Sequence, residues 1–310
     1  MNTRPKPFLI CGPTASGKSA LGMALARRTG GVIVNADALQ VYDCWRVLTA
    51  RPSVEDETEI PHRLYGHVTR RGRYSVGAWL REVDRILAEI TDRPLIVLGG
   101  TGLYFMALTQ GLTDIPETPA AIRVEGDEMR KRANATEFIA YLEEHDPKTL
   151  NKTDRMNAMR LQRAWEVHRA TGRGLASWQA DTPPPLISLE DSHAINLNSN
   201  VSWLNNRIAR RFDAMLDQGA LQECEQALAE GWDPALPSSR ALGAPELVAY
   251  LRGRTSLADA RERATIATRQ FAKRQRTWFR NKMKSWQQVE LSDKTDIETL
   301  AERLQNGKPV

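Results

Sequence analysis

The sequence is poor in cysteine and has no long run of apolar residues. Only three cysteines occur among 310 residues, and no two of them lie close together. This spacing excludes a zinc ribbon and a Cys-x-x-Cys redox motif, and such a sparse, odd count is typical of a reducing compartment. The longest uncharged stretch, 94–113, is broken by the glycines at 99, 100 and 102 and predicts a strand, a loop and a helix rather than a membrane span.

An extreme composition is also absent. Apolar residues make up 41% and charged residues 26% of the chain, which is normal for a globular protein with one large domain or two ordinary ones. The formal net charge of +5 only slightly favours an anionic partner. A short basic leader runs directly into a predicted strand, so we expect no signal peptide, a cytoplasmic location and no membrane association.

Short apolar runs alternate with segments of helical periodicity. This alternation predicts an α/β fold, with a P-loop NTPase-like parallel sheet flanked by helices. The predicted strands are 7–11, 32–34, 95–98 and 193–197, and the predicted helices are 17–29, 75–92, 103–108, 201–217, 219–230 and 257–283.

The middle of the chain has a different character. Residues 114–185 are rich in charge, poor in β-branched runs and helical in spacing, and they end in three consecutive prolines. We therefore predict a helical insertion domain at 114–185 within a core formed by 1–113 and 186–310.

One complete phosphate-binding motif, G-x-x-x-x-G-K-[ST], follows the first predicted strand and opens a helix. Its backbone N–H groups and the helix N-terminus would face one anion. Lys18 would reach the terminal phosphate, and the hydroxyl of Ser19 would bind Mg²⁺. The motif comprises Gly12, Pro13, Thr14, Ala15, Ser16, Gly17, Lys18 and Ser19.

No carboxylate follows the strand 95–98, where an NTPase usually has an acid that holds the metal. This absence weakens an NTPase interpretation and leaves other diphosphate chemistry open. Asp37, in contrast, follows the second strand at the edge where ligands of parallel sheets bind. It is a candidate general base, although a carboxylate in this position also often serves only as a helix cap or a solvated loop residue.

A strongly basic segment lies near the C-terminus. Residues 254–284 contain ten Lys or Arg and two acidic residues, interleaved with Phe271, Trp278 and Phe279. The aromatic residues fit a helix packed on the core, whereas the charge favours a polyanion such as RNA. The basic candidates are Lys273, Arg274 and Arg276 here, Arg207, Arg210 and Arg211 upstream, and Arg155, Arg160 and Arg163 in the insertion.

Several motifs, in this order, resemble those of the tRNA dimethylallyltransferase (isopentenyltransferase) family and span nearly the whole chain. The P-loop is shared by many enzymes, but Gly-Gly-Thr-Gly-Leu-Tyr at 99–104 and Ala-Lys-Arg-Gln-Arg-Thr-Trp within 270–280 are more specific. The other matching segments are Ala36–Tyr42, Arg160–Val167 with Thr171 and Gly172, and Arg240–Gly243.

The resemblance implies that the P-loop holds the diphosphate of dimethylallyl diphosphate, with Mg²⁺ as cofactor. The acceptor would be the exocyclic amine of the adenine 3′ of the anticodon in tRNA. Asp37 would be the general base, Thr101 would hold the reacting centre and Arg207 would bind the diphosphate. Apart from the resemblance, we expect a monomer. The residues expected to touch tRNA are Asp37, Ala38, Leu39, Gln40, Thr101, Arg123, Met159, Arg160, Leu161, Gln162, Arg163 and Arg240.

The sequence departs from the family pattern at four places, all of which concern individual tRNA contacts. Ala38 stands where the family usually has Ser, and Gly66 ends a segment that lacks the usual acid. The Gly-Thr-Ala-Lys-Pro and Gly-Tyr-Lys/Arg-Glu motifs read Leu-Thr-Ala-Arg-Pro at 48–52 and Gly-Ala-Pro-Glu at 243–246. The P-loop and Asp37 are unchanged.

Three alternatives remain at this stage. An isopentenyltransferase for free adenine nucleotides would not need the basic clusters. A P-loop kinase for a small metabolite would need the missing metal-binding acid. An RNA-binding protein that only senses a nucleotide would not need a base at Asp37.

Overall fold

The computed structural model describes residues 5–308, so the ends of the predicted core, 1–4 and 309–310, lie outside the described residues. The chain forms two compact units. The first runs up to Thr109 and resumes at Ile187, and the second is Gln110–Leu186, close to the predicted 114–185.

The first unit contains one six-stranded sheet with the order β3-β2-β4-β1-β5-β6, and every neighbouring pair is parallel. The strands β1, β2 and β4 are buried at every position, as expected for apolar strands covered on both faces. The predicted parallel α/β fold is confirmed. The strands are β1 (Phe8–Cys11), β2 (Val32–Asn35), β3 (His62–Arg63), β4 (Leu95–Gly99), β5 (His193–Ser199) and β6 (Gln287–Leu291).

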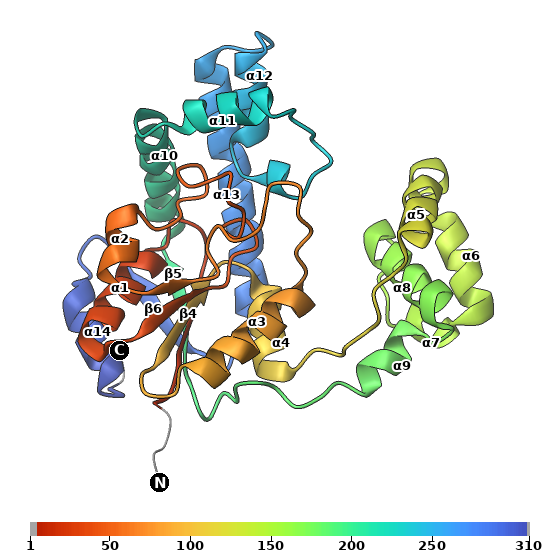
Figure 1. The fold of residues 1–310 in the computed structure, drawn as a ribbon, viewed down its shortest axis with the longest axis horizontal. Coiled ribbons are helices and arrows are strands. Elements are labelled where there is room, and N and C mark those ends of the chain that lie inside the picture. Colours follow the sequence, from red (N-terminus) through yellow and green to blue (C-terminus); the bar gives the residue numbers. More distant parts are fainter. Residues whose placement is uncertain (1–4, 309–310) are drawn as a thin grey trace. The chain divides into compact units, whose positions relative to one another are not determined.

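Helices cover both faces of this sheet (Figure 1). Alternate strand residues point to opposite sides, so Leu9 and Val34 belong to one core cluster and Ile10 and Ile33 to the other. The second of these clusters includes residues of α1 and α14, and the first includes residues of α3 and α4. These helices are α1 (Lys18–Thr29), α3 (Val76–Glu89), α4 (Gly102–Gln110) and α14 (Ile297–Gln305), with the short α2 (Val54–Glu59) at the edge.

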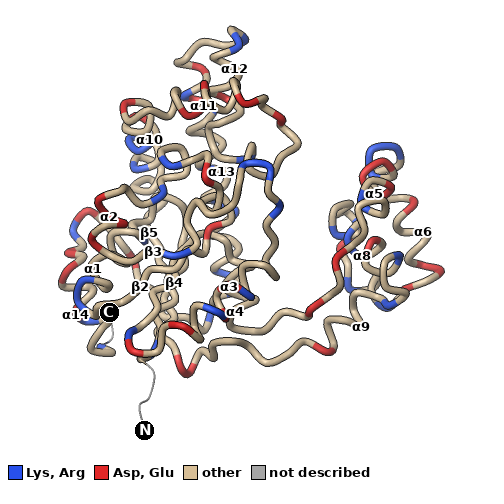
Figure 2. The backbone as a smooth tube through the Cα atoms, viewed as in Figure 1, with Lys and Arg blue, Asp and Glu red and all other residues tan. Residues whose placement is uncertain are grey.

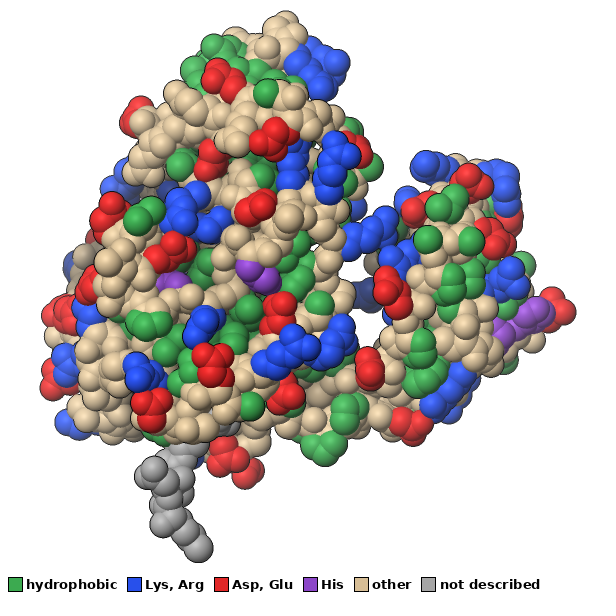
Figure 3. Space-filling view, in the orientation of Figure 1, with side chains coloured by type: hydrophobic (Ala, Val, Ile, Leu, Met, Phe, Trp, Pro, Cys, Tyr) green, Lys and Arg blue, Asp and Glu red, His purple; other side chains and the backbone are tan. Residues whose placement is uncertain are grey.

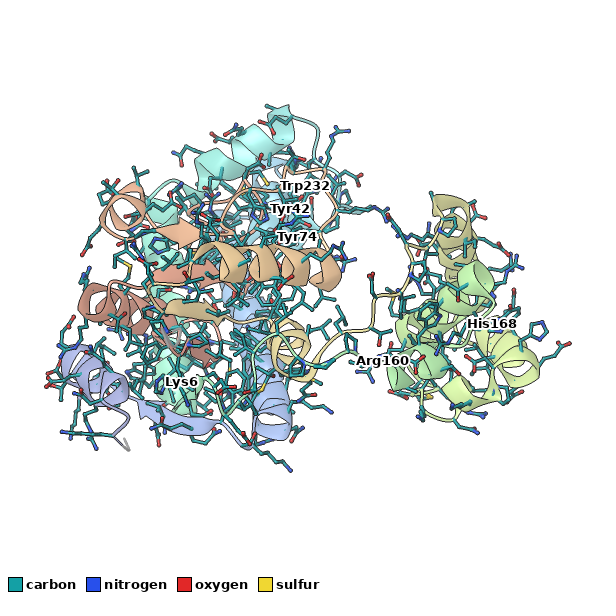
Figure 4. The ribbon with its side chains drawn as sticks, turned by 60° about the horizontal axis from the view of Figure 1, so that its bottom comes forward. Lys6, Tyr42, Tyr74, Arg160, His168 and Trp232 are labelled. Atoms are coloured by element: carbon teal, nitrogen blue, oxygen red, sulfur yellow. The ribbon has the colours of Figure 1, made fainter. Side chains whose placement is uncertain are left out.

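A third core lies among the helices that follow β5. Tyr42 and Trp45 are buried in it beside Phe212, and Tyr74 and Trp232 pack against it (Figure 4). The helices are α10 (Val201–Asp217), α11 (Ala220–Ala229), the 3-10 turn η1 (Ser238–Arg240), α12 (Ala244–Leu251) and α13 (Leu257–Lys282).

The second unit is built from helices around its own small core. Phe138, Leu142, Leu161 and Trp165 are fully or almost fully buried in it. The helices are α5 (Ala120–Ala133), α6 (Thr136–His145), α7 (Pro147–Leu150), α8 (Ala158–Thr171) and α9 (Leu175–Ala180). Within residues 5–308, none of the helices in either unit has the length and apolarity needed to cross a bilayer.

Candidate active site

Three loops meet at the carboxyl edge of the sheet because β2, β4 and β1 are neighbours there. They carry Asp37, the Gly99–Thr101 run and the P-loop, in that order. A side chain at Gly99 would place its Cβ 2.1 Å from the carbonyl of Ala36, so only glycine allows the first two loops to approach this closely. The Thr101 N–H donates to the Ala36 carbonyl at 3.1 Å and joins the same two loops.

Asp37 is held in place by its own loop. The buried Asn35 accepts from the Asp37 N–H at 2.8 Å and donates to its carbonyl at 3.0 Å. Asp37 Oδ1 accepts from the Leu39 N–H at 2.9 Å, whereas Oδ2 has no hydrogen-bond partner among the described residues. One oxygen of the carboxylate therefore closes the turn, and the other is available to take a proton. Thr101 supports this loop, since its hydroxyl accepts from the Ala38 N–H at 2.9 Å.

Asp37 lines two cavities that share Thr14, Thr49 and Arg211. The larger, of about 310 Å³, is bordered by the P-loop residues 14–19 and by the charged side chains of Arg51, Arg207 and Arg211, and we call it the polar cavity. The smaller, of about 40 Å³, has seven apolar residues among its twelve lining residues, and we call it the apolar cavity. Its apolar lining residues are Leu39, Leu48, Ile208, Phe212, Met215, Leu242 and Phe271.

The P-loop lies between β1 and α1, as its motif predicts. Lys18 Nζ donates to the Pro13 carbonyl at 2.7 Å. Desolvation lowers the pKa of Lys18 to about 8, although the nearby Asp37 opposes this shift. The Ser16 hydroxyl is buried and has no hydrogen-bond partner among residues 5–308, which is the state expected of a loop group that binds an anion.

Two arginines of α10 complete the polar cavity. Arg207 donates from Nε to the Ala15 carbonyl at 2.9 Å, with its guanidinium 4.7 Å from the Trp203 ring centroid. Arg211 donates to the Thr14 hydroxyl at 2.6 Å, and desolvation lowers its pKa to about 10. Arg210 is exposed. Of the predicted basic group on this helix, Arg207 and Arg211 therefore line the cavity and Arg210 faces the solvent. The sequence prediction missed the role of Arg211, although the i, i+4 spacing from Arg207 places both on one helix face.

A second missed residue is Arg51, which also lines the polar cavity. Its side chain is 8% exposed, and Nη1 donates to the carbonyls of Tyr42 and Asp43 at 3.3 Å. Arg51 belongs to the segment 48–52, which departs from the family pattern, and it stands where the family usually has Lys.

The cavity fits Mg²⁺ only when the ion arrives together with a phosphate ligand. Ser19 borders it, and its exposed hydroxyl makes no hydrogen bond within the described part of the chain. No group of three or more His, Cys, Asp and Glu side chains among residues 5–308 could hold a metal ion. Because Mg²⁺ in phosphate sites takes few protein ligands and completes its shell with phosphate oxygens and water, Ser19 is the P-loop residue that would contact such an ion.

The basic residues of α13 divide by exposure. Lys273 and Arg274 are exposed and have no ion pair within residues 5–308, and Arg276 is half-buried. Arg240, at the end of η1, is also exposed. Of the predicted tRNA contacts in the loop after β2, Ala38 is partly buried and Leu39 lines the apolar cavity, while Gln40 donates to the carbonyls of Thr49 and Ala50 at 2.9 and 2.8 Å.

The insertion presents only part of the predicted stretch 159–163. Met159 is 56% exposed and Arg160 is exposed, whereas Leu161 is fully buried. Gln162, 5% exposed, bonds to Asp127, Arg130 and Glu166. That Leu161 and Gln162 touch tRNA stays a prediction; in this structure both side chains are buried in the packing of the insertion. Arg163 donates to the Thr118 hydroxyl and Arg123 pairs with Glu117 at 3.0 Å.

Charge is mixed over the visible surface. In Figure 3, basic and acidic side chains are interspersed on the face shown. Figure 2 shows a concentration of Lys and Arg at the end of α5, where Arg130, Lys131 and Arg132 form the last turn. A basic total charge alone would not have located a nucleic-acid surface.

The sequence is similar to one protein family along most of its length. A family model described as IPP transferase matches residues 40–282, and one described as Isopentenyl transferase matches residues 5–74. The tRNA dimethylallyltransferase of Cereibacter sphaeroides is 58% identical over 286 residues, which cover 92% of this chain and 96% of that protein. That of Dinoroseobacter shibae is 58% identical over 92% of this chain and 94% of its own length.

Solved structures of similar fold carry names of the same kind. The full-length tRNA isopentenylpyrophosphate transferase of Bacillus halodurans has a TM-score of 0.70 at 28% identity, covering 98% of this chain and 95% of that one. A eukaryotic dimethylallyltransferase acting on tRNA has a TM-score of 0.83 at 24% identity over 99% of this chain and 81% of its own, which shows a common fold.

Proposed function

Because this chain belongs to the IPP transferase family, we propose that it is a tRNA dimethylallyltransferase, which transfers a dimethylallyl group from its diphosphate to an adenine amine. The observation that carries this proposal is that a phosphate cavity and an apolar cavity meet at Asp37. A diphosphate ester with a branched five-carbon group has the same division into a charged and an apolar part.

The diphosphate would occupy the polar cavity. The P-loop amides, Lys18, Arg207 and Arg211 surround it with positive charge, and the Ser16 hydroxyl is a further donor. The dimethylallyl group would extend toward Leu39 and Phe271 in the apolar cavity. Mg²⁺, with Ser19 as its protein ligand, would supply further neutralisation of the diphosphate when bound.

The reaction forms a bond between the adenine N6 and C1 of the allyl group while the C1–O bond to diphosphate breaks. Asp37 Oδ2 accepts the N6 proton, because the amine lone pair is delocalised and attacks usefully only as the proton leaves. The electron pair of the broken bond leaves on the diphosphate. Lys18 and the two arginines stabilise the charge that develops there, which lowers the barrier.

The acceptor is proposed to be the adenine 3′ of the anticodon in a tRNA. A base in a single-stranded loop can be extracted at lower cost than a paired one. Lys273, Arg274, Arg240 and Arg160 present exposed charges that would bind the RNA backbone.

The test is incubation of the protein with radiolabelled dimethylallyl diphosphate and either an unmodified anticodon stem-loop or AMP. We expect label in the stem-loop, with AMP less efficient by a factor on the order of 10³, since it lacks most of the phosphate contacts. The Lys18→Ala variant should lose transfer, and the protein should not hydrolyse ATP. Equal labelling of AMP would favour the free-nucleotide enzyme, and Lys18-dependent ATP hydrolysis would favour a kinase or NTPase.

A further inference from the structure

Gln275 lies within the basic segment of α13, but its side chain points away from solvent. It is 6% exposed, between the exposed Arg274 and the half-buried Arg276. Its Oε1 accepts from the Thr14 N–H of the P-loop at 2.8 Å. Its Nε2 donates to the Gly100 carbonyl at 2.9 Å. One amide therefore joins three segments that are far apart in the sequence.

This amide borders the unpartnered oxygen of the candidate base. A Cβ at Gly100 would lie 2.3 Å from Gln275 Nε2 and 3.2 Å from Asp37 Oδ2, so both atoms face the same small space. The absence of a side chain at Gly100 leaves that space open to the amide.

The hydrogen bonds to Thr14 and Gly100 explain why an amide side chain stands at position 275 and which way its amide is turned. The Thr14 N–H needs an acceptor and the Gly100 carbonyl needs a donor, and a neutral amide offers one of each. A buried amide is costly unless both of its ends are satisfied. The buried Thr268 of the same helix, in contrast, donates only to its own helix, at the Ala264 carbonyl. Core packing alone does not require the bridge that Gln275 makes.

We infer that Gln275 is a positioning residue that fixes the P-loop relative to the loops of Asp37 and Gly100. Through these bonds it sets the distance between the leaving group and the base. A misplacement of about 1 Å between reacting groups can cost on the order of 10²-fold in rate. This inference rests on the proposed function, because the two loops need a fixed spacing only if a transfer takes place between them.

Two variants test it. Gln275→Met keeps the size of the side chain and removes both hydrogen bonds, and Gln275→Asn keeps the amide but is too short to make both. We expect the single-turnover rate at saturating substrates to fall on the order of 10²-fold in each. The dissociation constant of the stem-loop should stay within about threefold, since the exposed charges of α13 are unchanged.

The matched control is Gln288→Met. Gln288 also joins segments, since it donates to the Met283 and Trp286 carbonyls and accepts from Asn196 and Asn198, but its partners in these bonds lie in neither the P-loop nor the loops of Asp37 and Gly100. This variant should lose thermal stability and keep its rate. Titration with inorganic pyrophosphate counts the competent sites in each protein, so a purely structural role of Gln275 would lower the number of sites and not the rate per site.

The outcomes separate the inference from the function. If the wild-type protein transfers no label, the proposed function fails. If it does and both Gln275 variants keep rates within about threefold of wild type, the positioning role is wrong. Hydrogen exchange of the wild-type P-loop provides a measurement without mutation: the Thr14 amide should be protected, and rapid exchange there would overturn the inference even if both variants misfold.

Discussion

Two cations at the P-loop, Lys18 and Arg211, and two of the helical insertion, Arg123 and Arg155, are held in opposite ways. Lys18 and Arg211 are desolvated, which lowers their pKa, and they donate to groups of the loop itself. Arg123 and Arg155 of the insertion lie nearer the solvent and pair with glutamates at 3.0 and 3.2 Å. A desolvated cation suits one small, multiply charged ligand, whereas a solvated ion pair gains only about 0–1 kcal/mol and can exchange its partner for a phosphate.

This difference predicts two kinds of functional residue. Substitutions in the cavities should change the rate or the affinity for the donor with little dependence on salt, because buried interactions are weakly screened. Substitutions of exposed cations should change RNA affinity and its dependence on salt.

The largest effect is expected at Asp37. Asp37→Asn should reduce the single-turnover rate by at least about 10², the usual contribution of a general base, and leave stem-loop affinity within about twofold. Rapid quench with labelled donor measures the rate. Asp43→Asn is the matched control, because this carboxylate is exposed on the same loop and outside both cavities. A nearly normal rate in Asp37→Asn would remove Asp37 from the chemistry.

The sequence predicted those parts of the site that depend on local pattern. The P-loop is a contiguous motif that follows an apolar strand, and Asp37 is found from its place after the next strand. Arg211 and Gln275 were missed because their roles depend on which face of α10 or α13 meets the loops. The direction of a side chain on a helix is set by tertiary packing, which the basic composition of these segments conceals.

The same limit explains why the sequence did not predict the burial of Leu161 and Gln162 or the strand β6. Leu161 and Gln162 lie in a segment that resembles a tRNA-binding motif, but the helix turns them into the core of the insertion. The strand β6 has two buried positions in five, so no apolar run marks it. It forms because β5 provides a parallel edge for pairing.

The next largest effect is expected on the exposed face of α13. The triple variant Lys273→Gln, Arg274→Gln and Arg276→Gln should weaken stem-loop binding on the order of 30-fold at low salt. The slope of log affinity against log salt should decrease by about 2 to 3, since each phosphate contact contributes about 0.9. Fluorescence anisotropy at several salt concentrations measures both.

A matched charge loss on other elements tests whether position matters. Lys6, Arg93 and Lys308 are exposed cations outside α13. Their triple substitution by Gln removes the same charge and should leave the salt slope unchanged. If both triple variants lowered stem-loop affinity and the salt slope equally, only the net charge of the protein would matter. The exposed face of α13 would then not be a specific RNA-binding surface.

Adjacent arginines of α10 compare a buried and an exposed cation directly. Arg211→Ala should raise the Michaelis constant for dimethylallyl diphosphate about tenfold, through loss of one desolvated charge next to the phosphates. Arg210→Ala, on the exposed side, should leave it unchanged. Steady-state kinetics at low and high salt measures the Michaelis constant of both variants. Equal Michaelis constants for Arg211→Ala and Arg210→Ala would contradict the placement of the donor in the polar cavity.

The smallest effect is the uptake of a fraction of a proton. The pKa of Lys18 lies at about 8 in the free protein, so about half of the molecules carry the neutral amine at pH 8. Bound pyrophosphate favours the charged form and raises this pKa. Binding at pH 8 should therefore take up about half a proton through Lys18. As the pH rises above 8, pyrophosphate affinity should decrease, because charging the amine then costs more.

Calorimetry in buffers of different ionisation enthalpy measures this uptake. Pyrophosphate titrates in the same range, so Lys18→Arg provides the reference: arginine keeps the charge and does not lose its proton. Arg211, with a pKa of about 10, stays charged at pH 8 in both proteins and cancels from the difference. The wild-type protein should take up about half a proton more than the variant at pH 8 and very little more at pH 6.5. Equal uptake by the two proteins at pH 8 would show that Lys18 is already fully charged, and that burial does not distinguish the P-loop lysine from the solvated cations of the insertion.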